Sequence, residues 1–174
     1  MIELLRTRRS IRQYTRQPIE AEKIELLKEA LLRAPSSRSL RPWKFIFVND
    51  PALLTQLAQT RPHGSQLLEN APLAIIIGGD ERQSDVWVED CSIAAIFVQL
   101  TAHSLGLGSC WIQIRNRRHN TDITAEAYIQ ELLNLPAELR LECIISLGYP
   151  AEHKAPIPRE ELHFHKINLN YYKD

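Results

Sequence analysis

The sequence predicts an α+β fold, a three-layer α/β/α sandwich in which helices cover both faces of a small sheet. The 174 residues are 44% hydrophobic and 24% charged, which is typical of a globular chain with one sizeable core. Four short segments have the composition of strands, and helical segments separate most of them. Helices and strands in this order pack as layers around one sheet. We therefore expect a single domain over residues 1–174.

The first long helix is expected over residues 19–33. Ile24, Leu27 and Leu31 fall on one stripe there, and Glu and Lys residues occupy the opposite face. Pro18 stands just before this segment, as helix starts favour. The helix is expected to end before Pro35, where serines favour a loop.

The central helix is expected over residues 85–105. This segment lacks Gly and Pro and is apolar around most of its circumference, which predicts burial on nearly every side. Gly106 follows at a position that favours a helix C-cap. Shorter helices are expected just before Arg8, over residues 53–58 and over residues 122–134.

The strands are expected over residues 43–48, 73–77, 109–114 and 141–147, where aromatic and β-branched residues are frequent. After residue 150 the composition changes to a proline-containing tail with little periodicity. The tail is too apolar to extend freely into solvent. We expect it to lie on a surface, either its own or a partner's.

The composition excludes several classes of protein. Lys and Arg number 21 and so do Asp and Glu, so no general attraction to nucleic acid is expected. The longest apolar run covers residues 93–98, far below the roughly 20 residues of a membrane-spanning helix. The N-terminus carries Glu3 and clustered arginines instead of an apolar secretory signal, so we expect a cytoplasmic protein.

The cysteines and histidines predict no metal site. Cys91, Cys110 and Cys143 are widely spaced, which argues against zinc or a disulfide scaffold and favours buried small hydrophobic side chains. His163 and His165 form a pair without a third ligand at a recognisable spacing. P-loop, GxGxxG, GxSxG and HExxH motifs are also missing from the sequence.

The neutral total charge hides a basic first quarter. Residues 1–44 contain eleven Lys or Arg against five Glu. The densest group is Arg8-Arg9-Ser10-Ile11-Arg12, where arginine forks and a hydroxyl could hold a phosphate. A solvated arginine cluster is the more common explanation of so short a motif, so the pentapeptide alone does not favour a phosphate site.

Four segments together resemble the nitroreductase family of flavin enzymes. They are RRSIRQY at 8–14, APSSRSLRPWKFIFV at 34–48, the helix over 90–105 running into LGLGSCWIQ at 105–113, and ISLGYP with PIPR within 145–159. Their order and spacing match the family over residues 8–159. The resemblance implies a small, mainly antiparallel sheet flanked by helices, with residues 150–174 as an interface tail that crosses to a dimer partner.

The resemblance also implies a function. Members of this family are homodimers that bind FMN non-covalently at the dimer interface. They take a hydride from NADH or NADPH by a ping-pong mechanism and reduce small acceptors such as nitroaromatics and quinones. The flavin carries the chemistry, so no catalytic side chain is expected.

The resemblance assigns expected roles to individual residues of the matching segments. Arg8 and Ser10 would hold the FMN phosphate with Arg9 beside them, and Arg12 would approach the pyrimidine edge of the flavin. Arg159 resembles the C-terminal basic residue of the phosphate clamp. Backbone groups near Gln113 and Ile114 would face the reactive flavin nitrogen. A loop that reaches the flavin from the other subunit is matched by Pro35, Ser36, Ser37 and Ser39.

Three positions depart from the family pattern, and two other functions stay open. Ser39 and Arg41 stand where Asn and Gln are common, and Ile114 stands where many members have Gly.

One alternative is an FMN enzyme of the same fold that performs reductive dehalogenation or flavin breakdown. The other is a non-catalytic protein that binds flavin or another phosphate ligand. The acceptor and the choice between NADH and NADPH are left open.

Overall fold

A four-stranded sheet forms the centre of the protein, in a computed structural model that describes residues 1–172. Its strands are β1 (Trp43–Val48), β2 (Leu73–Asp80), β3 (Gly108–Gln113) and β4 (Leu139–Gly148). They lie in the order β1-β2-β4-β3, and every neighbouring pair is antiparallel. The predicted small antiparallel sheet is therefore confirmed, and each predicted strand is found.

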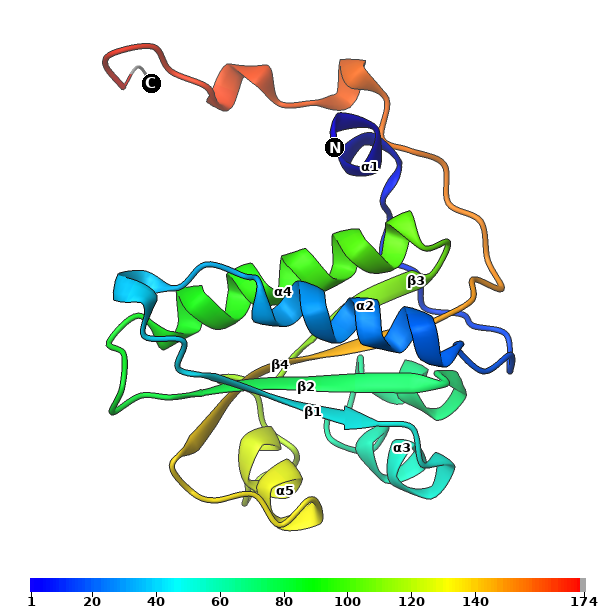
Figure 1. Ribbon diagram of the computed structural model, residues 1–174, viewed down its shortest axis with the longest axis vertical. Coiled ribbons are helices and arrows are strands. Elements are labelled where there is room, and N and C mark those ends of the chain that lie inside the picture. The colour runs from blue at the N-terminus through cyan, green and yellow to red at the C-terminus, as the bar shows by residue number, and fades with distance from the viewer. Residues whose placement is uncertain (173–174) are drawn as a thin grey trace.

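Helices cover both faces of this sheet (Figure 1). On one face lie α2 (Ala21–Leu32) and α4 (Trp87–Ser104), which pack along each other. On the other face lie α3 (Pro51–Leu57) and α5 (Ala125–Leu132). This arrangement confirms the predicted three-layer sandwich.

The apolar strand β2 explains why both faces need a cover. Ile75 and Ile77 belong to the core beneath α2 and α4, while Ala74 and Ile76 belong to the core beneath α3 and α5. Successive side chains of a strand point to opposite faces, so an uninterrupted apolar run buries both. All four of these residues are fully buried.

Local sequence signals set several helix ends. The side chain of Asp50 accepts a hydrogen bond from the backbone N–H of Leu53 at the start of α3, and Thr124 does the same for Ala127 in α5. Gly106 follows α4 with a φ of 78°, a conformation that favours glycine. The remaining short helices are α1 (Ile2–Thr7), η1 (Ser37–Ser39), η2 (Gln66–Asn70), η3 (Arg159–Glu161) and η4 (Phe164–Lys166).

The prediction that the central helix is buried on nearly every side is wrong for the single chain. Ile93, Ile96 and Phe97 of α4 are 36%, 39% and 38% exposed. Their spacing places them on one stripe of the helix. Apolarity around the circumference does not reveal which face packs on α2 and the sheet and which is left uncovered.

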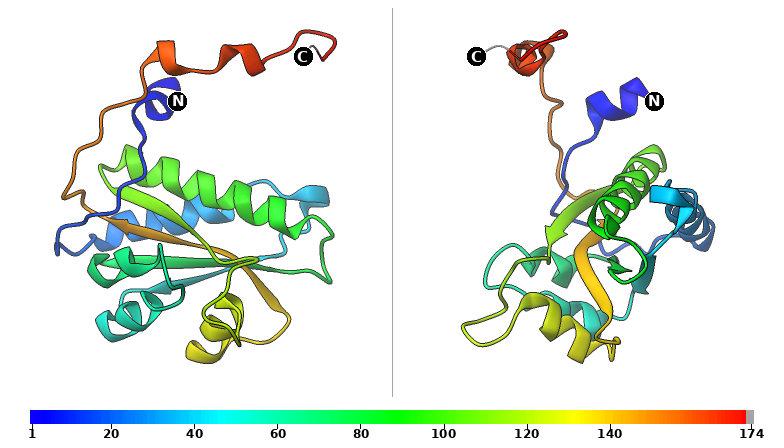
Figure 2. Two further views of the ribbon diagram at one scale, coloured as in Figure 1. Left: turned by 180° about the vertical axis from the view of Figure 1, so that it is seen from behind. Right: turned by 90° about the vertical axis from the view of Figure 1, so that its left-hand side faces the viewer.

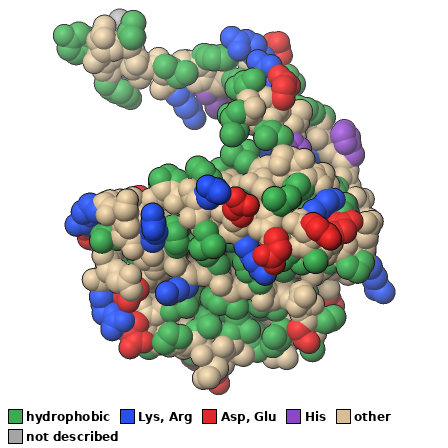
Figure 3. Space-filling model, in the orientation of Figure 1, with side chains coloured by type: hydrophobic (Ala, Val, Ile, Leu, Met, Phe, Trp, Pro, Cys, Tyr) green, Lys and Arg blue, Asp and Glu red, His purple; other side chains and the backbone are tan. Residues whose placement is uncertain are grey.

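The C-terminal tail, residues 150–172, leaves the sheet after β4, passes α1 and extends away from the body (Figure 2). Figure 3 shows hydrophobic side chains along this projecting segment. Ile167, Leu169 and Tyr172 are 74%, 83% and 81% exposed. The tail therefore does not bury its apolar side chains on its own chain.

The three cysteines are free and buried, as predicted. Burial raises the pKa of each thiol. Within residues 1–172, no helix is long and apolar enough to cross a lipid bilayer. The same residues contain no group of three or more His, Cys, Asp or Glu side chains placed to hold a metal ion.

Candidate functional site

The basic segment predicted as a phosphate site forms a strap, residues 8–14, that lies beside edge strand β3. Ile11 donates its backbone N–H to the carbonyl of Ser109 at 2.9 Å, and Ser10 pairs with Ser109 in a parallel bridge. The buried hydroxyl of Tyr14 donates to the carbonyl of Ile11 at 2.6 Å. The strap is therefore held against the sheet at several points.

A glycine makes this close approach possible. A Cβ atom on Gly108 would lie 2.7 Å from the Cβ of Ile11, closer than side-chain atoms can pack. The missing side chain lets the strap lie directly on the first residues of β3.

A strap pocket of about 330 Å³ lies between the strap, the end of α4 and the start of the tail. Its charged and histidine lining residues are Arg8, Arg9, His103, Glu152, His153 and Lys154. The pocket is therefore lined by three cationic side chains and one carboxylate. Such a set favours a phosphate or another small anion.

The single carboxylate is already bound to the strap. Glu152 Oε1 accepts the backbone N–H groups of Arg12 at 2.5 Å and Gln13 at 3.3 Å, and it lies 3.2 Å from Lys154 Nζ. The backbone N–H of Arg12 and the ammonium of Lys154 lower the pKa of Glu152. The carboxylate therefore orients the strap and leaves Arg8 and Arg9 free to bind an anion.

The structure brings part of the predicted phosphate set together. Arg8 and Arg9 line the strap pocket, and Arg9 also donates to the carbonyl of Ala155. Ser10 lies beside the pocket and accepts from Lys154 Nζ at 3.0 Å through its carbonyl. The Arg12 side chain is exposed.

Arg159 lies outside the strap pocket. Its guanidinium sits 4.9 Å from the centre of the Phe164 ring in the projecting tail. Lys154, which the sequence analysis missed, is the C-terminal cation beside Arg8. No local signal in the sequence marks Lys154, because its place beside the strap depends on the pairing of β4 with β3. The role expected for Arg159 stays a prediction.

The loop over residues 35–39 lies at the far end of α4. The backbone N–H of Ser37 donates to Asp90 Oδ1 at 2.8 Å, whereas Thr7, at the strap, contacts His103 Nε2 at 2.8 Å. Asp90 and His103 are thirteen residues apart on α4, which corresponds to about 20 Å along the helix. The predicted loop residues Pro35, Ser36, Ser37 and Ser39 therefore do not meet the strap within one chain (Figure 1).

This loop has an unusual backbone. Arg38, Ser39 and Arg41 have φ angles of 51°, 53° and 50°, in the left-handed region that non-glycine residues rarely adopt. Ser36 Oγ accepts the backbone N–H of Arg41 at 2.9 Å and helps to hold the turn. Several such residues together are most often found at functional sites.

The backbone groups at the end of β3 have partners within the chain. The carbonyl of Gln113 accepts from Arg61 at 3.1 Å, and the N–H of Ile114 donates to the carbonyl of Glu142 at 3.1 Å. The Ile114 side chain is fully buried beneath α3 and α5, so it does not project into the space beyond the strand.

A β-bulge places a buried carboxylate next to Gln113. Ile77 pairs with Cys143 but Gly78 pairs with Leu141, so Glu142 has no partner residue on β2. Bulges redirect side chains and are frequent beside functional sites. The buried Glu142 side chain accepts from Gln113 Nε2 at 3.3 Å through Oε1, and its Oε2 has no hydrogen-bond partner in the described chain. Burial raises the pKa of Glu142.

The fold and the site define a class of protein: an antiparallel α+β sandwich with a cationic pocket beside its edge strand. The chain belongs to the nitroreductase family, because a model described as "Nitroreductase family" matches residues 5–63 and 54–149. The predicted family and the predicted oxidoreductase class are confirmed.

Individual relatives agree with this assignment. The chain is 48% identical to an FMN-dependent nitroreductase from Clostridium difficile, with a TM-score of 0.97 over 99% of this chain and 100% of that one. It is 36% identical over 157 residues to an Archaeoglobus fulgidus protein provisionally named NADH dehydrogenase/NAD(P)H nitroreductase, covering 88% of this chain and 87% of the relative. An iodotyrosine deiodinase of Thermotoga neapolitana is 23% identical, covering 93% and 95%.

Proposed function

We propose that this chain is an FMN-dependent oxidoreductase that takes a hydride from NADH or NADPH and reduces nitroaromatics, quinones or similar small acceptors by a ping-pong mechanism. The observation that carries the proposal is the strap pocket, in which Arg8, Arg9 and Lys154 surround a space of about 330 Å³. Bound FMN supplies the two-electron chemistry.

The residues of the strap pocket fit the phosphate group of FMN. Arg8 and Arg9 present planar forks that match phosphate oxygens, and Lys154 adds a third positive charge. Glu152 offsets the charge of Lys154, with which it forms an ion pair of 3.2 Å, so Arg8 and Arg9 give the pocket its excess of positive charge. The Arg12 side chain and backbone groups near Gln113 and Ile114 are proposed to face the flavin ring.

We propose a homodimer with FMN at its interface. The loop over residues 35–39 and the strap lie about 20 Å apart along α4, so both can contact one flavin only if the loop comes from a second subunit. The exposed apolar stripe of α4 and the projecting tail are surfaces that a partner would cover. We propose that residues 150–174 form this interface tail and that the rest of the chain is one FMN-binding domain.

The deiodinase relative supports a second candidate function. It is 23% identical to this chain and is named an iodotyrosine deiodinase, which favours reductive dehalogenation as the alternative reaction. The two candidates share the FMN site and differ in the acceptor. A panel of nitroaromatic, quinone and halogenated phenol acceptors therefore distinguishes them.

The first experiment is a visible spectrum of the protein purified with FMN, taken before and after anaerobic NADH or NADPH. Flavin bands that bleach are expected. Bands that persist with both reductants would support non-catalytic binding instead, and a colourless protein would contradict the proposal.

Replacement of a strap arginine tests whether the FMN seen in the spectrum is bound at the strap pocket. We expect Arg8→Ala to weaken FMN binding by about tenfold or more, because a charge-assisted contact with the phosphate is lost. Arg16→Ala is the matched control, since Arg16 is an exposed arginine that does not line the strap pocket. Wild-type affinity in Arg8→Ala would contradict the assignment of the pocket.

A further inference from the structure

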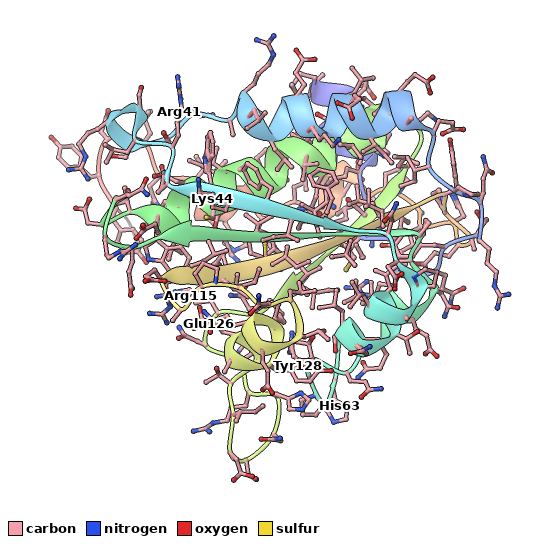
Figure 4. The ribbon with its side chains drawn as sticks, turned by 60° about the horizontal axis from the view of Figure 1, so that its bottom comes forward. Arg41, Lys44, His63, Arg115, Glu126 and Tyr128 are labelled. Atoms are coloured by element: carbon pink, nitrogen blue, oxygen red, sulfur yellow. The ribbon has the colours of Figure 1, made fainter. Side chains whose placement is uncertain are left out.

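A second cationic pocket lies at the opposite end of β3 from the strap. This loop pocket has a volume of about 500 Å³ and lies between the end of β3, the start of β4 and α5. Its charged residues are Glu81, Arg115, Arg117, Arg118, Glu126 and Arg140. Figure 4 labels Arg115 and Glu126 at this end of the sheet.

The loop pocket is separate from the strap pocket. Gly108 lines the strap pocket and Ile114 lines the loop pocket. Six residues of extended chain separate them, which corresponds to about 20 Å. A single phosphate therefore cannot occupy both pockets.

Both carboxylates of the loop pocket pair with the same arginine. Arg140 binds Glu126 through two hydrogen bonds of 3.1 and 3.0 Å, and it binds Glu81 at 3.0 Å. These contacts raise the pKa of Arg140. Glu81 and Glu126 therefore lie against Arg140, and the four arginines of the pocket exceed its two carboxylates by two positive charges.

The other three arginines keep their charge largely uncompensated. Arg115 Nε lies 4.0 Å from Glu142 Oε2, and Arg118 donates only to the carbonyl of Thr121 at 3.0 Å. The Arg117 side chain has no hydrogen-bond or ion-pair partner among residues 1–172. Burial and the nearby charge of Arg117 lower the pKa of Arg61.

Backbone hydrogen bonds hold these arginines in place. The N–H groups of Ile114 and Arg115 both donate to the carbonyl of Glu142, at 3.1 and 3.0 Å. Arg117 donates to the carbonyl of Ile114 at 3.0 Å and accepts from Ala125 at 2.9 Å. Because the loop is ordered before any ligand arrives, less conformational freedom is lost on binding.

We propose that the loop pocket binds a phosphate of the nicotinamide nucleotide that reduces the enzyme. This inference rests on the proposed function and names the part of the reductant that the chain recognises. Arginine forks around a polar cavity recognise phosphate oxygens, and the pocket begins at Ile114, directly after the end of β3 at Gln113. The phosphate is either the 2′-phosphate, which only NADPH carries, or the pyrophosphate that NADH and NADPH share.

The test is calorimetric titration of adenosine 2′,5′-bisphosphate, ADP and uncharged adenosine into the FMN-loaded and the FMN-free protein. We expect wild-type protein to bind at least one phosphate-bearing probe more tightly than adenosine. Arg117→Ala should weaken that binding by about tenfold, and Arg117→Lys, which keeps the charge without the fork, by less. Arg33→Ala, which removes an exposed arginine of the α2 surface, should bind as the wild type does.

The pattern of loss identifies the phosphate. If Arg117→Ala weakens binding of the bisphosphate only and raises the KM for NADPH alone, the pocket binds the 2′-phosphate. If the variant also binds ADP more weakly and its KM is raised for both nucleotides, the pocket binds the pyrophosphate. Wild-type protein that binds neither phosphate probe above adenosine, or Arg117→Ala protein that binds them unchanged, would overturn the proposal.

The FMN spectrum separates this proposal from the proposed function. A sample whose flavin bands bleach with NADH but whose Arg117→Ala variant binds every probe normally contradicts only the loop pocket. A sample without flavin bands contradicts the proposed function, whatever the probes do. A urea unfolding midpoint measured for each variant shows that Arg117→Ala is folded, and Arg118→Ala is the second variant if it is not.

Discussion

The side-chain carboxylate of Asp90 accepts the backbone N–H of Ser37 at 2.8 Å and thereby fixes the loop over residues 35–39 to the first turn of α4. The other carboxylate oxygen accepts from the hydroxyl of Ser84 at 3.2 Å. Asp90 is only 2% exposed, so both contacts are shielded from water. One buried carboxylate thus holds a loop in which several residues have left-handed backbone conformations.

Replacement of Asp90 tests whether this contact holds the loop in its flavin-binding form. We expect Asp90→Ala to lower the free energy of unfolding by about 1–3 kcal/mol, because the partly buried N–H of Ser37 loses its charged partner. FMN affinity should fall as well, if the loop completes the site of the second subunit. Urea unfolding and an FMN titration measure the two effects. Asp85→Ala, at an exposed carboxylate that pairs with Arg38, should change neither by much.

Replacement of Gly108 tests the contact between the strap and β3. In Gly108→Ala the new methyl group would meet Ile11 at 2.7 Å, so we expect the strap to be displaced and FMN binding to weaken by about tenfold or more. Gly64→Ala is the control, since its φ of 92° imposes strain far from the strap without a close contact. An unchanged FMN dissociation constant in Gly108→Ala would show that strap position does not govern binding.

Glu142 should make a pH-dependent contribution to stability. Burial raises its pKa, and the hydrogen bond from Gln113 and the charge of Arg115 only partly oppose that effect. A carboxyl with a raised pKa in the folded state binds its proton more tightly there than in the unfolded chain, so stability falls as pH rises above about 4.5.

The variant Glu142→Gln removes this titration. We expect it to gain stability relative to the wild type as pH rises from 4 to 8, with little difference between the two at the acid end. The measurement is the difference between their urea unfolding midpoints across this range. A difference that stays constant with pH would contradict the expected titration.

Truncation of the tail tests the proposed dimer. A chain that ends after Pro156 keeps Ala155, which binds Arg9, and loses the exposed apolar residues beyond it. We expect this chain to sediment as a monomer and to lose FMN on gel filtration, because the apolar surface that a partner would cover is absent. Lys166→Ala, at a polar residue of the same segment, should remain a dimer. A truncated chain that stays dimeric would show that the interface lies elsewhere.

Several elements could be predicted from local sequence alone. The run over residues 43–48 and the apolar run that begins at residue 73 both became strands, because β-branched and aromatic residues favour extended structure. Arg8 and Arg9 stood out as part of a dense arginine motif, and the resemblance to the family gave them a predicted role at the phosphate; the structure places both at the strap pocket.

Other members of the site could not be predicted because they depend on contacts between distant residues. Lys154 reaches the carbonyl of Ser10 only because β4 ends beside β3 and the strap. Glu142 is redirected by a bulge whose register depends on β2. The loop pocket collects arginines from two segments, and Arg140 alone pairs with both Glu81 and Glu126.

The sequence by itself determined the helices and strands, the layered α+β fold and the cationic strap, because hydrophobic period, turn residues and charge density act over short stretches of chain. Only the tertiary structure decided which face of α4 stays exposed, which cations share a pocket and how far the 35–39 loop lies from the strap. Those properties depend on strand register and helix packing, in which each side chain is placed by residues far away in the sequence.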